Sequence, residues 1–281
     1  MRVHVYDRAT QFLPIAEPLL QADPLSTNVI AVVANRIAAS YEPGSSHHWW
    51  ATVEDDAGRL VGVAMHTPPH HVFVSRMPGE AAASLGHVLA DDGRYVPGVN
   101  GAIGSTGAFA ETWRGRTGHD SEVVTAMRVY QLGELAPPRG VPGQSVVAKT
   151  EPEIDLIAEW LAAFHDEARP HEPAGDWHAL AERRVGAGEL QLWRDDDIFV
   201  ALAGVSAPTL GVARVGPVYT PPHYRRRGYG AAVTAKVTGA ALNAGAQHVI
   251  LYTDLANPIS NSIYQAIGYR PDHDAEERAF R

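Results

Sequence analysis

Three arginines and two glycines in the last quarter of the chain have the spacing of an anion-binding turn. Positions 225–230 read Arg-Arg-Arg-Gly-Tyr-Gly. They follow an apolar run at 210–215 that predicts a strand, and precede an Ala-, Val- and Leu-rich run at 231–244 that predicts a helix. A strand that feeds a helix through a tight turn exposes backbone N–H groups at the positive end of the helix dipole. Because Gly228 and Gly230 have no Cβ, a phosphate can approach the main chain closely.

Two common phosphate-binding motifs do not fit this turn. A dinucleotide fingerprint needs a third glycine three residues after the second, but position 233 is Val. A nucleoside-triphosphate loop ends in Gly-Lys-Ser or Gly-Lys-Thr, whereas this turn continues Gly230-Ala231-Ala232. The pattern that matches is Arg-x-x-Gly-x-Gly, and so short a motif is also compatible with a solvated basic turn.

A second set of residues with chemical potential follows the β-branched run at 247–253, which predicts a strand. Asn257 suits the N-cap of a short helix, Pro258 its first position and Gly268 the residue after its end. Tyr264 falls inside this helix, seven residues after Asn257. The two motifs together are far more specific than either alone.

Over roughly the last 75 residues, the two motifs resemble the GNAT family of N-acetyltransferases, and the whole chain resembles its tandem type. The resemblance implies an α/β fold, with a central twisted mixed sheet flanked by helices in each of two domains. It implies acetyl-CoA as co-substrate and no metal. The residues that it assigns to the coenzyme are, for the pantetheine arm, Val218, Tyr219, Thr220, Asn257 and Ser260, and, for the pyrophosphate, Arg225, Arg226, Arg227, Gly228, Tyr229, Gly230 and Ala231.

Acetyl transfer from a thioester to an amine also needs an acid for the leaving thiolate and a base for the amine. The resemblance gives the acid role to Tyr264, whose type has a pKa of about 10 against about 8.5 for a thiol. A core tyrosine is the alternative reading. The base is not identified, because the strand at 212–218 holds no acid. His165, Asp166, Glu167 and Asp254 are weak candidates, and water-relayed deprotonation is equally compatible.

Composition narrows the class of protein. The chain has 281 residues, a net charge of −9 and no cysteine, which excludes disulfides, thiolate metal sites and an acyl-cysteine intermediate. An acidic chain is a poor general partner for nucleic acid. No apolar run reaches the ~18 residues of a membrane span, and the first residues lack a signal-peptide core. We therefore expect a cytoplasmic protein, as a monomer or homodimer. The family resemblance implies that its partner is an amine on a small molecule or on a protein.

The order of expected elements repeats once along the chain. Each half reads strand, helices, hairpin with an acidic turn, strand, helix, strand, helix, and Pro/Gly-rich residues 135–143 form the predicted linker. We therefore predict domains at 1–134 and 144–281. In the first half, Arg76-Met77-Pro78-Gly79-Glu80 stands where the phosphate turn should be, with one glycine, a proline and an acid. The first domain is thus expected to be a degenerate GNAT-like domain without coenzyme.

The spacing of the 14 histidines does not indicate a metal site. The pairs at 47–48 and 70–71 are adjacent rather than four residues apart on a helix, and prolines at 170 and 173 separate His165, His171 and His178. The sequence is compatible with two functions: an N-acetyltransferase acting through a ternary complex, and a non-catalytic acyl-CoA-binding sensor or scaffold. The sequence does not name the acceptor.

Overall fold

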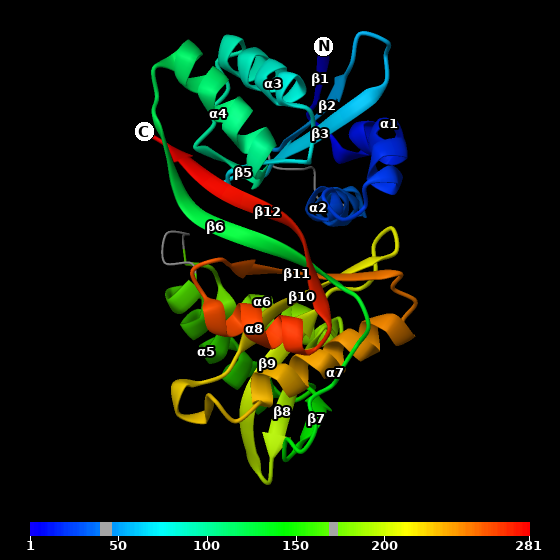
Figure 1. Cartoon of the computed structure of the whole chain (residues 1–281), viewed down its shortest axis with the longest axis vertical. Helices are drawn as coiled ribbons and strands as arrows, with labels where there is room; N and C mark the ends of the chain where they lie inside the picture. Colours follow the sequence, from blue (N-terminus) through cyan, green and yellow to red (C-terminus); the bar gives the residue numbers. More distant parts are fainter. Residues whose placement is uncertain (40–46, 169–173) are drawn as a thin grey trace. The chain divides into compact units, whose positions relative to one another are not determined.

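The computed structural model describes residues 1–39, 47–168 and 174–281, and it contains two compact units. The first unit comprises Met1–Met127 with His273–Arg281, and the second unit comprises Arg128–Asp272. Each unit is a mixed sheet flanked by helices (Figure 1). The α/β class predicted from the sequence is confirmed.

In the first unit, strand order is β1-β2-β3-β4-β5-β12; β4 and β5 pair in parallel, whereas β1–β2, β2–β3, β3–β4 and β5–β12 are antiparallel. The elements of this unit are β1 (Arg2–Tyr6), α1 (Ala9–Ala22), α2 (Asn28–Ala39), β2 (Trp49–Glu54), β3 (Leu60–His66), β4 (Val72–Val74), α3 (Gly79–Asp91), β5 (Gly98–Ala102), α4 (Ile103–Thr117) and the end of β12 (Tyr269–Phe280).

In the second unit, strand order is β6-β11-β10-β9-β8-β7, with β10 and β11 parallel. Its elements are the end of β6 (Ser121–Leu132), β7 (Gln144–Val147), α5 (Glu151–Ala168), α6 (Trp177–Gly186), β8 (Leu190–Asp195), β9 (Ile198–Val205), β10 (Val212–Tyr219), the short 3-10 helix η1 (Pro222–Tyr224), α7 (Tyr229–Asn243), β11 (His248–Asp254) and α8 (Pro258–Ala266).

The two units repeat the same element order, as the sequence predicts, but the last strand of each repeat crosses over. Strand β12 ends the second repeat, yet its residues Ala275–Ala279 pair antiparallel with β5 of the first unit (Figure 1). Strand β6 ends the first repeat and lies next to β11 in the second unit. The compact units therefore have bounds that differ from the domains expected at 1–134 and 144–281. The sequence analysis did not anticipate β12, which is rich in charged residues.

The segment expected as a linker is attached to the second unit. The N–H of Ala136 donates to the Ile267 carbonyl at 3.0 Å, and the Trp193 indole N–H donates to the Pro142 carbonyl at 2.8 Å. Proline and glycine prevent regular structure here, but they do not prevent docking along a neighbouring surface.

Each sheet buries side chains on both faces. In the second unit, α7 and α8 cover a core with Val215, Val233 and Tyr264, while α5 and α6 cover another with Trp160 and Leu202. Successive residues of a strand point to opposite faces, which is how β9 serves both cores. In the first unit, α3 and α4 cover one face and α1 and α2 the other.

Helix α1 runs unbroken through Pro14 and Pro18, although proline usually kinks or ends a helix. Both prolines are on the exposed side of α1, where water can bind the carbonyls that lose a partner. No helix in the part of the chain that the structure describes is long and apolar enough to cross a bilayer.

Candidate functional site

The turn between β10 and α7 has the backbone of an anion-binding nest. Arg226 has φ of 64° and Gly228 has φ of 84°, so two left-handed residues stand just before the first turn of α7. Gly228 is the N-cap of α7 and has no side chain to satisfy the helix N–H groups. Left-handed geometry in an arginine is strained, and such strain concentrates at functional sites. Successive N–H groups in this geometry form a concave anion site.

The two glycines of the turn have little room for a side chain. A Cβ at Gly230 would lie 3.3 Å from the Thr220 hydroxyl oxygen, and a Cβ at Gly228 would lie 3.0 Å from a Val141 methyl group. Val141 belongs to the segment expected as a linker. A residue outside both motifs thus helps to shape the turn, and the sequence carried no signal for it.

Strands β10 and β11 separate beside this turn. They pair in parallel from Val212–His248 to Val215–Leu251, and within the described residues this pairing stops there although both strands continue. Across the sheet, Val218 still pairs with Ala203 of β9, after a register shift between Val215 and Val218. The bulge predicted from Pro217 is therefore present. Among the residues that the structure describes, the main chain of Val218, Tyr219 and Thr220 is left with no strand partner on the β11 side.

The side chain of Arg225 is directed away from the nest. Its Nη2 donates to both carboxylate oxygens of Glu167 at 2.7 and 2.9 Å, and its Nε donates to the Thr220 carbonyl at 2.8 Å. The guanidinium also lies 5.9 Å from the centre of the Tyr219 ring. Arg225 therefore braces the turn against the end of α5, and the coenzyme contact expected of it would come from its backbone.

The other side chains of the turn divide into exposed and buried ones. Arg226 and Arg227 are exposed, and Ala231 is half-buried. Tyr229 is buried, and its hydroxyl donates to a carboxylate oxygen of Asp195 in the acidic β8–β9 turn. That hydrogen bond is the main reason why the pKa of Tyr229 is raised. Gly228 as the N-cap and Tyr229 through its hydrogen bond to Asp195 thus position the first turn of α7.

Helix α8 begins as its sequence predicts. The Asn257 side chain accepts a hydrogen bond from the Ser260 N–H at 3.0 Å, so one amide oxygen is occupied by capping. The Asn257 NH₂ group remains for a ligand. A pantetheine contact by Asn257 can therefore use its NH₂ group or the second lone pair of its oxygen, whereas one by Ser260 has to use a group other than this N–H.

Tyr264 lies in the same buried core as Tyr229. Its ring packs edge-on against Tyr269 with centroids 6.3 Å apart, and the side chain is 9% exposed. Burial raises the pKa of Tyr264 to about 12. A hydroxyl of this kind stays protonated at neutral pH, but it is a weaker acid than an exposed tyrosine.

A polar group that the sequence analysis missed anchors α8 from the side of β6. The Tyr130 hydroxyl donates to Asn261 Oδ1 at 3.1 Å and accepts from Gln265 Nε2 at 2.9 Å. Asn261 also donates to the Asp254 carbonyl at 2.9 Å. No short-range pattern signals Tyr130, because it lies 134 positions before Tyr264 in the chain.

In the structure, the candidate bases already make contacts with other residues of the chain. Glu167 is held by Arg225. His165 is buried, lies 3.3 Å from Asp166 and packs 4.8 Å from the Trp177 ring. Asp254 accepts from the Ala256 N–H at 2.7 Å. Glu167 is thus better described as a positioning residue for the turn than as a base, while water-relayed deprotonation remains compatible with the site.

Similarity to known proteins agrees with this geometry. Residues 154–269 match the model of the acetyltransferase (GNAT) family. No curated protein matches the chain in sequence. Among solved structures, a GCN5-related N-acetyltransferase from Sphaerobacter thermophilus is similar with a TM-score of 0.63 at 16% identity, over 99% of this chain and 95% of that one. A GNAT-family acetyltransferase from Colwellia psychrerythraea is similar with a TM-score of 0.58 at 12% identity, over the full length of both.

A tandem GNAT protein from the clavulanic acid biosynthesis pathway is also similar, with a TM-score of 0.56 at 12% identity, over 100% of this chain and 98% of that one. The fold is therefore that of GNAT proteins, and this tandem GNAT protein shares it along the whole chain. Residues 154–269 match the GNAT acetyltransferase family model, which confirms the resemblance carried by the two motifs. Acyl transfer is the general activity that this family indicates.

Proposed function

We propose that the second unit binds acetyl-CoA in the separation between β10 and β11 and transfers its acetyl group directly to an amine. The observation that carries this proposal is the combination of that separation with the nest at Arg226–Gly228. A strand-like pantetheine arm finds unpaired main chain at Val218–Thr220, and a pyrophosphate finds helix N–H groups at the end of the same gap. A GNAT family domain over 154–269 supports this choice of coenzyme.

The residues of the chain then have separable tasks. The backbone of 226–231 holds the pyrophosphate, and Glu167 with Arg225 keeps the turn in position. Asn257 and Ser260 flank the arm from α8. Bound acetyl-CoA supplies an activated thioester. Tyr264 donates a proton to the sulfur as it leaves, and the acceptor amine loses its proton through water.

The acceptor is an amine on a small molecule or on a protein, and direct transfer is proposed because the chain has no cysteine to carry an acyl group. Acetyl-CoA is a cytoplasmic metabolite, so the proposal places the reaction in the cytoplasm. The first unit, in this proposal, binds no coenzyme.

The second candidate is an acyl-CoA-binding sensor without catalysis. The observation that favours it is the burial of Tyr264, because a tyrosine with a pKa of about 12 is a poor proton donor to a thiolate. The two candidates share the coenzyme site and differ only at the chemical step.

Two measurements on the full chain separate these outcomes. Isothermal titration with acetyl-CoA tests the coenzyme site, and release of free CoA in the presence of a broad panel of amines tests transfer. Binding with CoA release supports the enzyme. Binding without release from any amine supports the sensor. Absence of binding would mean that the turn only connects β10 to α7, and both candidates would fall.

A further inference from the structure

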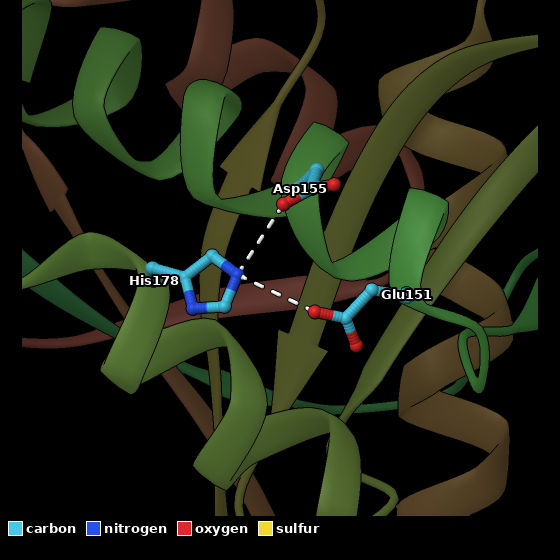
Figure 2. Close-up of side chains that lie close together, drawn as sticks. All are labelled: Glu151, Asp155 and His178. Atoms are coloured by element: carbon cyan, nitrogen blue, oxygen red, sulfur yellow. Dashed lines mark ion pairs between the residues drawn. The ribbon is translucent and has the colours of Figure 1, made fainter.

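Helices α5 and α6 bring three potential metal ligands together away from the coenzyme turn. Glu151 and Asp155 lie four residues apart at the start of α5, so both carboxylates are on one face of the helix. His178 lies in the first turn of α6, and Figure 2 shows its ring directed at both carboxylates. One ligand atom from each of the three residues lies within 4.8 Å of the other two.

The distances suit a small divalent cation. The His178 Nε2 is 3.3 Å from an Asp155 oxygen and 3.8 Å from a Glu151 oxygen (Figure 2). A tetrahedral zinc ion with bonds of about 2.0 Å holds neighbouring ligand atoms about 3.3 Å apart. The Asp155–His178 pair already has this separation, and Glu151 needs only a side-chain adjustment, which its exposed position allows.

The other ring nitrogen of His178 has a partner of its own. Its Nδ1 faces Glu182 of α6 at 3.9 Å. A histidine that binds a metal through one nitrogen commonly has a carboxylate near the other, which fixes the tautomer and the ring orientation. His178 has this arrangement: Glu151 and Asp155 face Nε2, and Glu182 faces Nδ1.

The charge around His178 also favours a cation. Glu151, Asp155 and Glu182 place three carboxylates around one imidazole. Helix α5 contains no lysine or arginine. Within the described ranges, the ion pairs of Glu151 and Asp155 are to His178 alone. Repulsion between the carboxylates is relieved best by a divalent ion, since a single protonated imidazole cannot neutralise them all.

We propose that Glu151, Asp155 and His178 form a binding site for zinc or a similar divalent transition metal ion, with water completing its coordination. One imidazole with two carboxylates matches the ligand preference of zinc better than that of magnesium or calcium, which take oxygen ligands. The ion joins the starts of α5 and α6 and is separate from the proposed acyl transfer. This proposal replaces the expectation of no metal, which considered histidine spacing but not helix-to-helix contacts.

The test uses the full chain stripped of metal with a chelator. Zinc is titrated calorimetrically, and cobalt is titrated in parallel because its visible absorption reports four-coordinate geometry. We expect one equivalent to bind, and we expect Asp155→Asn or His178→Gln to weaken that binding at least about tenfold. Both positions are on the surface, so the variants should fold, and zinc should raise the melting temperature of the wild type but not of either variant.

His87→Gln is the matched control. His87 is also half-exposed and lies 3.2 Å from a carboxylate four residues away, Asp91, but no third ligand joins that pair within the described part of the chain. This variant should bind zinc as the wild type does. Zinc binding that is absent in the wild type, or that is unchanged in both Asp155→Asn and His178→Gln, would overturn the proposal and leave His178 as an ion-pair partner of its neighbours.

Discussion

The strand–helix turns β4–α3 and β10–α7 occupy the same position in the two repeats. In the first turn a side chain binds the backbone groups, whereas in the second turn no side chain of the described residues caps them. In the first unit, the Met77 N–H donates to the Ser105 hydroxyl at 3.0 Å, and the same hydroxyl donates to the Met77 carbonyl at 3.2 Å. The turn is therefore closed by a side chain from α4. In the second unit, the turn has left-handed residues at Arg226 and Gly228 and no capping side chain.

The strands beside the two turns also differ: they stay paired beside the first turn and separate beside the second. Strand β4 stays paired with β5 up to its last residue, Val74, which faces Gly101 so closely that a Cβ there would lie 2.2 Å from the Val74 carbonyl oxygen. Strands β10 and β11 part four residues before β10 ends. At the start of α3, Glu80 places a negative charge where the second unit has basic residues. These contrasts support the proposal that only the second unit binds coenzyme.

The largest expected effect comes from placing a carboxylate in the open turn. Gly228→Glu should weaken acetyl-CoA binding by about 100-fold or more, because the charge and the Cβ both oppose the pyrophosphate. The matched control is Gly79→Glu at the start of α3, which should leave the affinity unchanged. Isothermal titration measures both. Binding that survives Gly228→Glu but is lost in Gly79→Glu would reverse the comparison.

Tyr264→Phe separates transfer from binding. Removing the hydroxyl should lower kcat by about 10- to 100-fold, because one general acid contributes on this scale, while the acetyl-CoA dissociation constant stays within about twofold. Steady-state release of CoA gives kcat, and calorimetry gives the affinity. An unchanged kcat would assign Tyr264 to the core alone.

Ser105→Ala tests whether the closed turn serves stability alone. The substitution leaves the buried Met77 N–H without its acceptor, which should cost about 1–3 kcal/mol of unfolding free energy. Urea denaturation measures this cost. Acetyl-CoA affinity should not change, and gain of a second binding equivalent would show that the first turn can open for coenzyme.

Acid should destabilise the first unit through His66. Burial lowers the pKa of His66 from 6.5 to about 4; a hydrogen bond with the backbone of His70 opposes this shift, and the nearby imidazoles of His48 and His71 add to it. The unfolded chain therefore takes up the proton first, so this contribution is complete above pH 6.5 and is lost as the pH falls towards 4. Near pH 5.5 the loss should be about 1 kcal/mol, measured by urea denaturation against the variant His66→Phe. Equal pH dependence of the two proteins would contradict the assignment.

The smallest expected effect concerns the brace on the open turn. Glu167→Gln removes one charge of a half-exposed ion pair, so acetyl-CoA affinity should fall only about three- to fivefold. Asp166→Asn changes the neighbouring, more exposed acid and is the control. If Glu167 were the base instead, kcat would fall strongly with little change in affinity, and the pH profile of kcat would lose its acidic limb.

Local sequence patterns were enough for much of this fold. The capping box at Thr150–Glu153 predicts the start of α5, and Glu153 does accept hydrogen bonds from the Lys149 and Thr150 N–H groups at 2.7 and 2.9 Å. The start of α8 at Asn257 and the bulge near Pro217 were found for the same reason. Each of these features depends on residues only a few positions apart, and neighbouring side chains determine their local geometry.

What the sequence by itself determined is therefore the class of the chain, the position of the turn and the short helix after it. Tertiary structure decided the rest. It paired β12 with the first unit, turned Arg225 towards Glu167, brought Val141 over Gly228 and placed His178 beside Asp155. These contacts join residues distant in sequence, and they depend on burial and packing across elements, which no local pattern of residue types encodes.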